Sequence, residues 1–221
     1  MHRDDHWESI YSSRNWGKWP SLDLIRFLAS EDFAEGACAL ELGPGSGANL
    51  WPVALRGFSI AGVDISPSAV DQARKKLHTE VRGWKEFPDG LVDGSVTSLP
   101  FGIAEFDLLI DVECVSCLPV GAAQVAYAEA YRVAKPGARL FVQTFGGRTD
   151  VGEVQRPDDG LIQPETGPLA TVPGVRLTSG TAELAQLLGP WTIREVNTST
   201  RTVSSGSMLI EEFVVIADKH H

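Results

Sequence analysis

The sequence is poor in cysteine, in methionine and in basic residues. Its 221 residues include three cysteines and two methionines, and 19 Lys and Arg stand against 29 Asp and Glu. An odd number of cysteines gives no disulfide framework and fits a reducing compartment. The formal net charge of -10 argues against nucleic acid as a partner, because such binding depends on Lys and Arg that neutralise phosphates. We therefore expect a small-molecule partner.

Long apolar runs are also absent from the sequence. No run reaches the roughly 18 to 20 residues that a bilayer-spanning helix needs, and the first residues, MHRDD, are too polar to begin a signal peptide. These features predict a soluble, cytoplasmic protein that does not bind membranes and that exists as a monomer or a homodimer. The final pair, His220 and His221, is typical of a purification-tag remnant and is left out of the site.

The apolar residues that are present follow an α/β pattern. They make up 43% of the sequence, which can fill a full core, and the length predicts one domain over residues 1–219. Strand-like runs alternate with helical segments, as in a Rossmann-like, doubly wound seven-stranded sheet that is mostly parallel. The last two strands are joined only by the turn SSGS and should form an antiparallel hairpin, because a parallel crossover needs about a dozen residues. Strands are expected at 38–42, 58–65, 91–96, 106–114, 138–145, 191–203 and 208–219, and helices after Pro20 and at 46–57, 68–81, 122–137 and 181–188.

Two segments lie outside this alternation. Residues 1–19 form a polar N-terminal arm that is rich in tryptophan. Residues 146–177 are rich in Gly, Pro, Asp and Thr and show no periodicity. Loops of this length in compact domains usually have a function. We predict that residues 146–177 form a lid or substrate loop.

The stretch ALELGPGSGAN, residues 39–49, places three glycines two positions apart where the first strand turns into a helix. Open α/β sheets bind ligands at this carboxyl edge. Gly43, Gly45 and Gly47 permit backbone conformations closed to other residues and let a ligand approach the main chain. A tight turn without a ligand is the alternative, and glycine spacing alone is a weak signal.

Two acidic residues narrow the choice of ligand. Asp64 ends the second strand, 19 residues after Gly45, where an acidic side chain accepts hydrogen bonds from both hydroxyls of a ribose. A dinucleotide and S-adenosylmethionine both satisfy this pattern, and Ala48 would complete a dinucleotide fingerprint. Glu41 favours S-adenosylmethionine, because a carboxylate suits an ammonium and a sulfonium group but not a pyrophosphate.

With these residues the sequence resembles the class I S-adenosylmethionine-dependent methyltransferase family over most of its length. ALELGPGSG is similar to the family's acidic-x-Gly-x-Gly-x-Gly loop, and VDISPSAVDQARKK to its second-strand acid and the following helix. VTSLPFGIAEFDLLID and EAYRVAKPGARLFVQTF are similar to the segments around its fourth and fifth strands. The resemblance implies an enzyme that uses S-adenosylmethionine, releases S-adenosylhomocysteine and methylates a small molecule.

The resemblance also implies roles for single residues. The glycine loop bounds the methionine part of the cofactor, Asp64 holds the ribose, and Ile65 lies along the adenine. Relatives commonly carry an acidic residue where this chain has Ser95, whose hydroxyl can still accept from the adenine amino group. The main-chain amide of Val96 can serve an adenine ring nitrogen. Asp111 resembles a position whose main chain borders the cofactor.

The segment DVECVSCLP, at the end of the fourth strand, faces the transferred methyl group in this architecture. Glu113 is its best-placed ionisable side chain for a substrate hydroxyl or amine, and a general base is needed only when the acceptor must lose a proton. A solvated loop acid is the alternative for Glu113. Cys114 and Cys117 are interpreted as small buried residues, because one pair without further ligands is thin evidence for a metal. No metal is expected.

The arm completes the predicted site. Tyr11, Trp16 and Trp19 are expected to cover a substrate pocket, since aromatic bodies with polar tips suit small-molecule sites, although docking of the arm on the core explains them equally well. The leading function is methyl transfer to a small molecule. The alternatives are an NAD(P)-dependent oxidoreductase, which Glu41 and the terminal hairpin disfavour, and a module that binds S-adenosylmethionine without catalysis.

Overall fold

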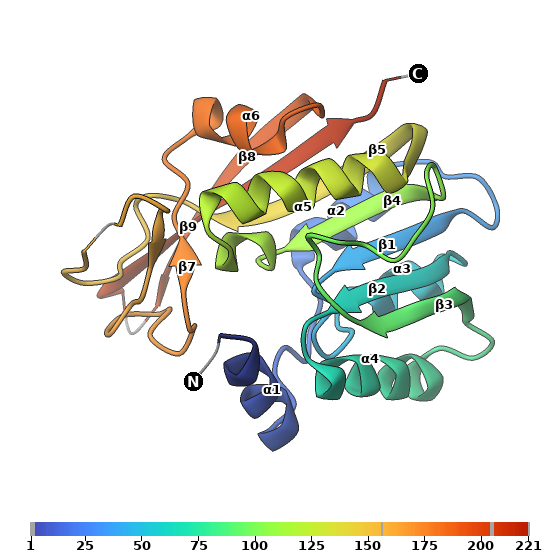
Figure 1. Cartoon of the computed structure of the whole chain (residues 1–221), viewed down its shortest axis with the longest axis horizontal. Coiled ribbons are helices and arrows are strands. Elements are labelled where there is room, and N and C mark those ends of the chain that lie inside the picture. Colours follow the sequence, from blue (N-terminus) through green and yellow to red (C-terminus); the bar gives the residue numbers. More distant parts are fainter. Residues whose placement is uncertain (1–2, 156, 204–205, 221) are drawn as a thin grey trace.

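A seven-stranded sheet forms the centre of the molecule (Figure 1). The computed structural model describes residues 3–155, 157–203 and 206–220. The strand order is β3-β2-β1-β4-β5-β9-β8, in which β9 runs antiparallel to both β5 and β8 and the other pairs are parallel. The predicted fold class is confirmed. The strands are β1 (Cys38–Leu42), β2 (Ser59–Asp64), β3 (Lys85–Asp93), β4 (Phe106–Val112), β5 (Ala134–Phe145), β8 (Thr192–Val203) and β9 (Met208–Asp218).

Helices cover both faces of the sheet, which therefore has an apolar core on each side. One core joins α2, α3 and α4 to the sheet, and the other joins α5 and α6 to it. Burial on both faces explains why β1, β2 and β4 read as nearly continuous apolar runs. The helices are α1 (Arg3–Ser13), α2 (Leu22–Ser30), α3 (Leu50–Leu55), α4 (Pro67–Glu80), α5 (Val120–Val133) and α6 (Thr181–Leu188), with a 3-10 turn, η1, at Val115–Cys117.

Serine caps begin two of these helices as their sequences predict. Ser21 accepts a hydrogen bond from the amide of Leu24 at 3.3 Å, and Ser66 accepts one from the amide of Ala69 at 3.1 Å. Pro67 follows Ser66 at the first helical position, where no amide donor is needed. The second cap matters for the site, because it fixes the turn that directly follows the end of β2.

Some predicted boundaries were wrong. Strand β3 begins at Lys85 rather than at residue 91, and its pairing with β2 shifts register at Ile60 because residues 87–90 interrupt the ladder. Helix α5 ends at Val133, and residues 134–137 belong to β5. The SSGS turn lies partly outside the described residues, but the strands on either side of it pair antiparallel as predicted.

Two segments without predicted structure contain regular elements. The arm begins with helix α1, and residues 146–177 contain a two-stranded antiparallel pair, β6 (Leu161–Ile162) with β7 (Val175–Arg176). This pair packs around a small apolar cluster of its own. Both segments lie at the end of the sheet toward which β1, β2 and β4 point (Figure 1). No helix in the described part of the chain is long and apolar enough to cross a membrane.

Candidate active site

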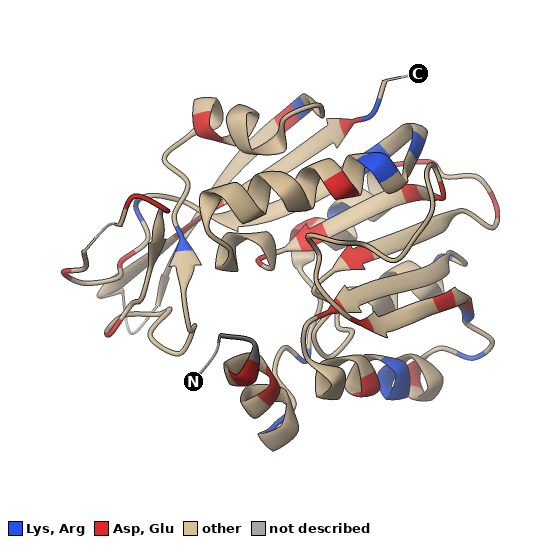
Figure 2. Cartoon of the chain, in the orientation of Figure 1, with Lys and Arg blue, Asp and Glu red and all other residues tan. Residues whose placement is uncertain are grey.

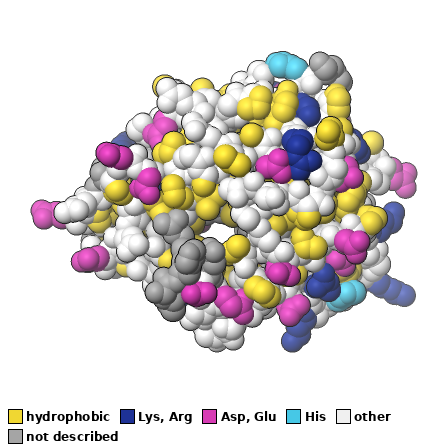
Figure 3. Space-filling model, in the orientation of Figure 1, with side chains coloured by type: hydrophobic (Ala, Val, Ile, Leu, Met, Phe, Trp, Pro, Cys, Tyr) yellow, Lys and Arg dark blue, Asp and Glu magenta, His cyan; other side chains and the backbone are white. Residues whose placement is uncertain are grey.

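A cavity of about 410 Å³ opens at the carboxyl ends of the parallel strands, a size within the range of roughly 300–1,000 Å³ for small-molecule sites. The molecule is hollowed at this end in Figure 3. Acidic residues gather at the tips of the parallel strands there, with few basic ones beside them (Figure 2). Ten of the predicted site residues line the cavity: Tyr11, Trp16, Trp19, Gly43, Gly45, Asp64, Ile65, Ser95, Val96 and Glu113.

Three predicted site residues do not line the cavity. They are Glu41, Gly47 and Asp111, which lie in the layer behind its wall. Gly47 is required for packing: its φ is 79°, and a Cβ there would lie 2.8 Å from the Cα of Ala73 in α4. The glycine therefore lets α4 approach the loop closely.

Gly45 sits at the centre of the glycine loop, directly under the arm. Its φ of 53° lies in the left-handed region, and a Cβ at this position would lie 2.4 Å from the hydroxyl of Tyr11. The amide of Gly45 donates to Oδ2 of Asp64 at 2.9 Å. The loop is thus fixed from one side by the second strand and from the other by the arm.

Asp64 has both carboxylate oxygens anchored by main-chain amides. Oδ1 accepts from the amide of Ser66 at 3.0 Å, while Oδ2 accepts from Gly45. A carboxylate has about four acceptor sites, so two remain for hydroxyl groups in the cavity. Burial raises the pKa of Asp64, and hydrogen bonds from main-chain amides, foremost those of Ser66 and Gly45, oppose that shift. The geometry presents a fixed, acceptor-only group to the cavity.

Glu41 is fully enclosed behind the glycine loop. Its Oε1 accepts from Nδ2 of Asn49 at 2.9 Å, whereas Oε2 is buried and has no hydrogen-bond partner in the described part of the chain. Burial raises the pKa of Glu41 to about 8. Asn49 itself lines the cavity, and its Oδ1 accepts from the amide of Ser21. Glu41 therefore acts on the cavity through Asn49, whose side-chain amide it binds.

Asp111 braces the turn that follows β4. Its Oδ2 accepts from the Tyr127 hydroxyl at 2.7 Å, and its Oδ1 accepts from the amides of Cys114 and Val115 at 3.0 Å. Burial raises the pKa of Asp111. The side chain thus holds the η1 turn, which carries Glu113 into the cavity wall.

Glu113 combines a strained backbone with a shifted pKa. Its φ of 63° is unusual for a residue with a side chain, and such outliers persist where the surrounding structure fixes them, commonly at functional sites. The amide of Glu113 donates to the carbonyl of Gln143 at 2.9 Å. Burial and the adjacent carboxyl of Glu212 raise the pKa of Glu113 to about 8.

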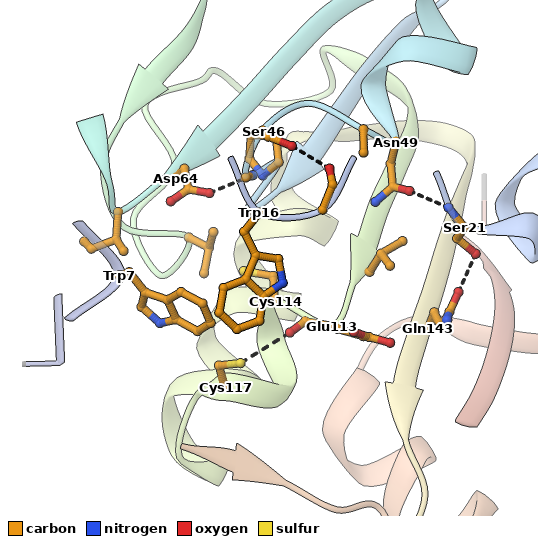
Figure 4. A pocket seen from close by; sticks show the side chains of 18 of the residues that line it. Trp7, Trp16, Ser21, Ser46, Asn49, Asp64, Glu113, Cys114, Cys117 and Gln143 are labelled. Atoms are coloured by element: carbon orange, nitrogen blue, oxygen red, sulfur yellow. Dashed lines mark hydrogen bonds between the residues drawn. The ribbon is translucent and has the colours of Figure 1, made fainter. Parts of the chain in front are cut away.

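A chain of polar side chains lines the wall beside Glu113, and the sequence did not predict it; Figure 4 shows its first hydrogen bond, between Ser21 and Gln143. Ser21 Oγ donates to Gln143 Oε1 at 2.5 Å, and Gln143 Nε2 donates to Glu212 Oε1 at 2.8 Å. Arg201 Nε reaches Glu212 Oε2 at 3.3 Å. The one available signal was two acids in the otherwise apolar run MLIEEFVVIA, since acids are seldom fully buried without partners.

The arm lies across the open side of the cavity. The ring of Trp7, which was not among the predicted site residues, stacks on Tyr11 and meets Trp16 edge-on, with centroids 6.4 and 6.3 Å apart. Trp19 lies at the margin with 78% of its surface exposed. Glu8 fastens the arm to α4, because Oε2 accepts from the Ser66 hydroxyl at 2.6 Å. One side chain thus joins the arm to the turn that also binds Asp64.

The two cysteines at this end of the sheet are free thiols. Cys117 is buried, Cys114 is half-buried, and no group of three or more metal-ligating side chains exists among the described residues. Burial raises the pKa of both thiols, so they are protonated at neutral pH. This agrees with their interpretation as small packing residues.

Comparison with known proteins adds independent evidence. Residues 40–142 match the family model described as a methyltransferase domain. This segment belongs to the class I S-adenosylmethionine-dependent methyltransferase family. The matched segment runs from β1 to β5 and contains the glycine loop, Asp64 and Glu113. The match confirms the family, the fold class and the cofactor that the sequence predicted.

Individual relatives show how far the likeness extends. Demethylmenaquinone methyltransferase of Tropheryma whipplei is 30% identical over 132 residues, which are 55% of this chain and 52% of that protein. The chain thus spans about half the length of this curated relative. Among solved structures, a SAM-dependent methyltransferase from Methanosarcina mazei has a TM-score of 0.68 at 24% identity, covering 91% of this chain and 99% of its own. A structure that concerns the conversion of a disulfide bond into a thioacetal group during echinomycin biosynthesis has a TM-score of 0.75 at 17% identity. The match covers 99% of this chain and 93% of that one.

The donor set of the cavity fits S-adenosylmethionine. A cationic cofactor is favoured by the acidic groups at the wall, whereas a pyrophosphate would be repelled. Asp64 keeps two acceptor sites for a ribose. Among the described residues that line the cavity, Arg201 is the one Lys or Arg, and its Nε is already directed at Glu212.

Proposed function

We propose that this chain transfers a methyl group from S-adenosylmethionine to a small-molecule acceptor. The observation that carries the proposal is the presence of Asp64, the glycine loop and Glu113 in one cavity at the carboxyl edge of the sheet. When bound, the cofactor supplies an electrophilic methyl group on a cationic sulfur. The matched relative from Tropheryma whipplei is named for a small molecule, demethylmenaquinone, which supports a small acceptor here.

The residues of the wall divide into two groups in this proposal. Asp64 accepts the ribose hydroxyls, Ile65 borders the adenine, and the hydroxyl of Ser95 with the amide of Val96 serves the adenine edge. The glycine loop bounds the methionine part of the cofactor. Glu113 takes the proton that the acceptor loses, at a position next to the bound methyl group.

The segments around the cavity exclude water from it in this proposal. Trp7, Tyr11 and Trp16 of the arm shield the reacting atoms from water, and residues 146–177 close the other side with Val172 in the wall. Both belong to the single domain predicted over residues 1–219. The oligomeric state, predicted as monomer or homodimer, stays a prediction.

An oxidoreductase is the weaker candidate. The sequence contains one Tyr-x-x-x-Lys spacing, the pair that some nicotinamide enzymes use, at Tyr131 and Lys135. Neither residue lines the cavity: Tyr131 packs edge-on against Trp191, and Lys135 pairs with Asp107 at 2.7 Å. A structural role therefore explains this spacing.

Thermal unfolding with three ligands tests the proposal. We expect S-adenosylmethionine and S-adenosylhomocysteine to raise the melting temperature. A ligand that binds only the folded chain increases the free energy of unfolding by about 2.7 kcal/mol at a hundredfold excess over its Kd. NADH should leave it unchanged, since its pyrophosphate would face the acidic wall. Stabilisation by NADH without stabilisation by S-adenosylhomocysteine would contradict the proposal. Release of S-adenosylhomocysteine from S-adenosylmethionine in the presence of an acceptor then distinguishes an enzyme from a binding module.

A further inference from the structure

Two carboxyl groups from different parts of the chain meet at the inner end of the cavity. Glu113 follows β4 and Glu212 lies on β9; both side chains line the cavity, and the adjacent carboxyl of Glu212 raises the pKa of Glu113. Glu212 is 95% buried and is held by Gln143 on one oxygen and by Arg201 on the other. Glu113 has no cationic side chain of its own within hydrogen-bond distance in the described part of the chain.

Among the described residues, the charged groups near this pair are Asp111, Arg201 and the buried Arg176 of β7, which donates to the carbonyls of Val115 and Leu118 and does not line the cavity. Asp111 lies behind Glu113 in β4, and the neutral thiol of Cys117 donates to the Glu113 carbonyl from η1. The cation that faces the pair is Arg201 of β8, whose side chain is 57% exposed and so partly screened by water. An anionic acceptor would therefore be repelled, and a cationic group is favoured electrostatically.

We infer that the acceptor of the proposed methyl transfer carries a basic amine, and that Glu113 and Glu212 together bind it in its ammonium form and take its proton. The inference rests on the proposed function and names its substrate class. The N–H bond breaks, its electron pair stays on nitrogen, and the proton joins a carboxylate oxygen of Glu113 or Glu212. As this lone pair forms a bond to the methyl carbon, the methyl–sulfur bond would break and its electron pair would stay on sulfur in S-adenosylhomocysteine. The tryptophans of the arm provide aromatic faces that attract an ammonium group.

The proton balance favours an amine over a hydroxyl. An ammonium that loses its proton becomes a neutral amine, whose remaining N–H groups can donate hydrogen bonds to Glu113 and Glu212. A hydroxyl that loses its proton to one of these carboxylates becomes an oxyanion that faces the other, still charged, carboxylate. Like charges at this distance in a buried site raise the free energy of that state. The pair thus suits nitrogen as the methylated atom.

Calorimetry on the chain saturated with S-adenosylhomocysteine tests the inference with three probes of the same shape: benzylamine, benzyl alcohol and benzoate. Benzylamine should bind most tightly and benzoate least. Binding of the cation should displace the proton of Glu113, because the raised pKa of Glu113, about 8, keeps that carboxyl protonated at pH 7. Titrations in buffers of different ionisation enthalpy should therefore show proton release in the wild type and none in Glu113→Gln.

Two neighbouring glutamates give a matched comparison. Glu212→Gln should weaken benzylamine binding at least about tenfold, the loss expected for a hydrogen bond to a charged group. Glu211→Gln should leave it unchanged, because Glu211 is equally buried but pairs with Arg148 and does not line the cavity. Affinity for S-adenosylhomocysteine serves as the folding control for all variants, and Glu113→Gln replaces Glu212→Gln if the latter does not fold.

The outcomes separate the inference from the proposed function. A wild-type chain that does not bind S-adenosylhomocysteine contradicts the proposed function itself. A chain that binds it but shows no benzylamine binding, no proton release, equal binding of benzyl alcohol or benzoate, or unchanged benzylamine affinity in Glu212→Gln overturns the inference alone.

Discussion

Replacing Glu113 by glutamine should lower kcat by about 10²–10⁴-fold, the usual contribution of a positioned general base. The amide keeps the size of the side chain and the φ of 63° but does not accept a proton. Affinity for S-adenosylhomocysteine should be unchanged, because Glu113 contacts the acceptor end of the cavity in our proposal. Steady-state kinetics of S-adenosylhomocysteine release, with calorimetry for the product, gives both values.

The pH dependence provides a second readout for the same variant. A general base must be ionised to act, and burial beside Glu212 raises the pKa of Glu113 to about 8. The wild-type kcat/KM should therefore rise as the pH increases through that value and then level off. Glu113→Gln should lose this rise. A variant that keeps the wild-type rate and pH profile would remove Glu113 from the chemistry and leave it a structural role.

Replacing Asp64 by alanine should weaken S-adenosylhomocysteine binding by about 10²–10⁴-fold. Each hydrogen bond to a charged group contributes about 1.5–3 kcal/mol, and two ribose hydroxyls are proposed to share this carboxylate. The variant also frees the amides of Gly45 and Ser66, so part of the loss comes from the loop itself. Calorimetry measures the affinity.

A matched control separates these two contributions. Asp64→Asn keeps one oxygen for a loop amide but places an NH₂ group, a donor, where the other amide now donates, and it removes the charge. The affinity of Asp64→Asn for S-adenosylhomocysteine should lie between those of the wild type and Asp64→Ala. Replacement of Asp93 by alanine is the surface control, because Asp93 also ends a strand of the sheet but does not line the cavity. Wild-type affinity in Asp64→Ala would place the ribose elsewhere.

Local signals in the sequence were enough to predict the sheet and the cofactor edge. The glycine loop and Asp64 are adjacent to strands whose apolar runs are unambiguous, and parallel strands bring their carboxyl ends together. Ser66 and Pro67 likewise mark a helix start by their own chemistry. These features depend on residues within a few positions of one another.

The remaining features depend on long-range contacts and were missed for that reason. Glu212 meets Glu113 and Gln143 only because β9 inserts antiparallel beside β5, a register that no local pattern encodes. Helix α1 has little amphipathic character, and it is fastened to the fold by Glu8 on the Ser66 turn. The apolar cluster under the β6–β7 pair joins residues up to about sixty positions apart, so the segment reads as irregular.

Hydrogen exchange with and without S-adenosylhomocysteine tests most directly whether the cofactor binds in this cavity under the arm. We predict that bound ligand increases protection in the glycine loop at residues 43–49, in the turn at 64–66 and in helix α1, while the distant α6 exchanges at the same rate in both states. Deletion of residues 1–19 should remove only the protection that the arm contributes. Ligand-induced protection elsewhere in the chain, with 43–49 and 64–66 unchanged, would contradict the account.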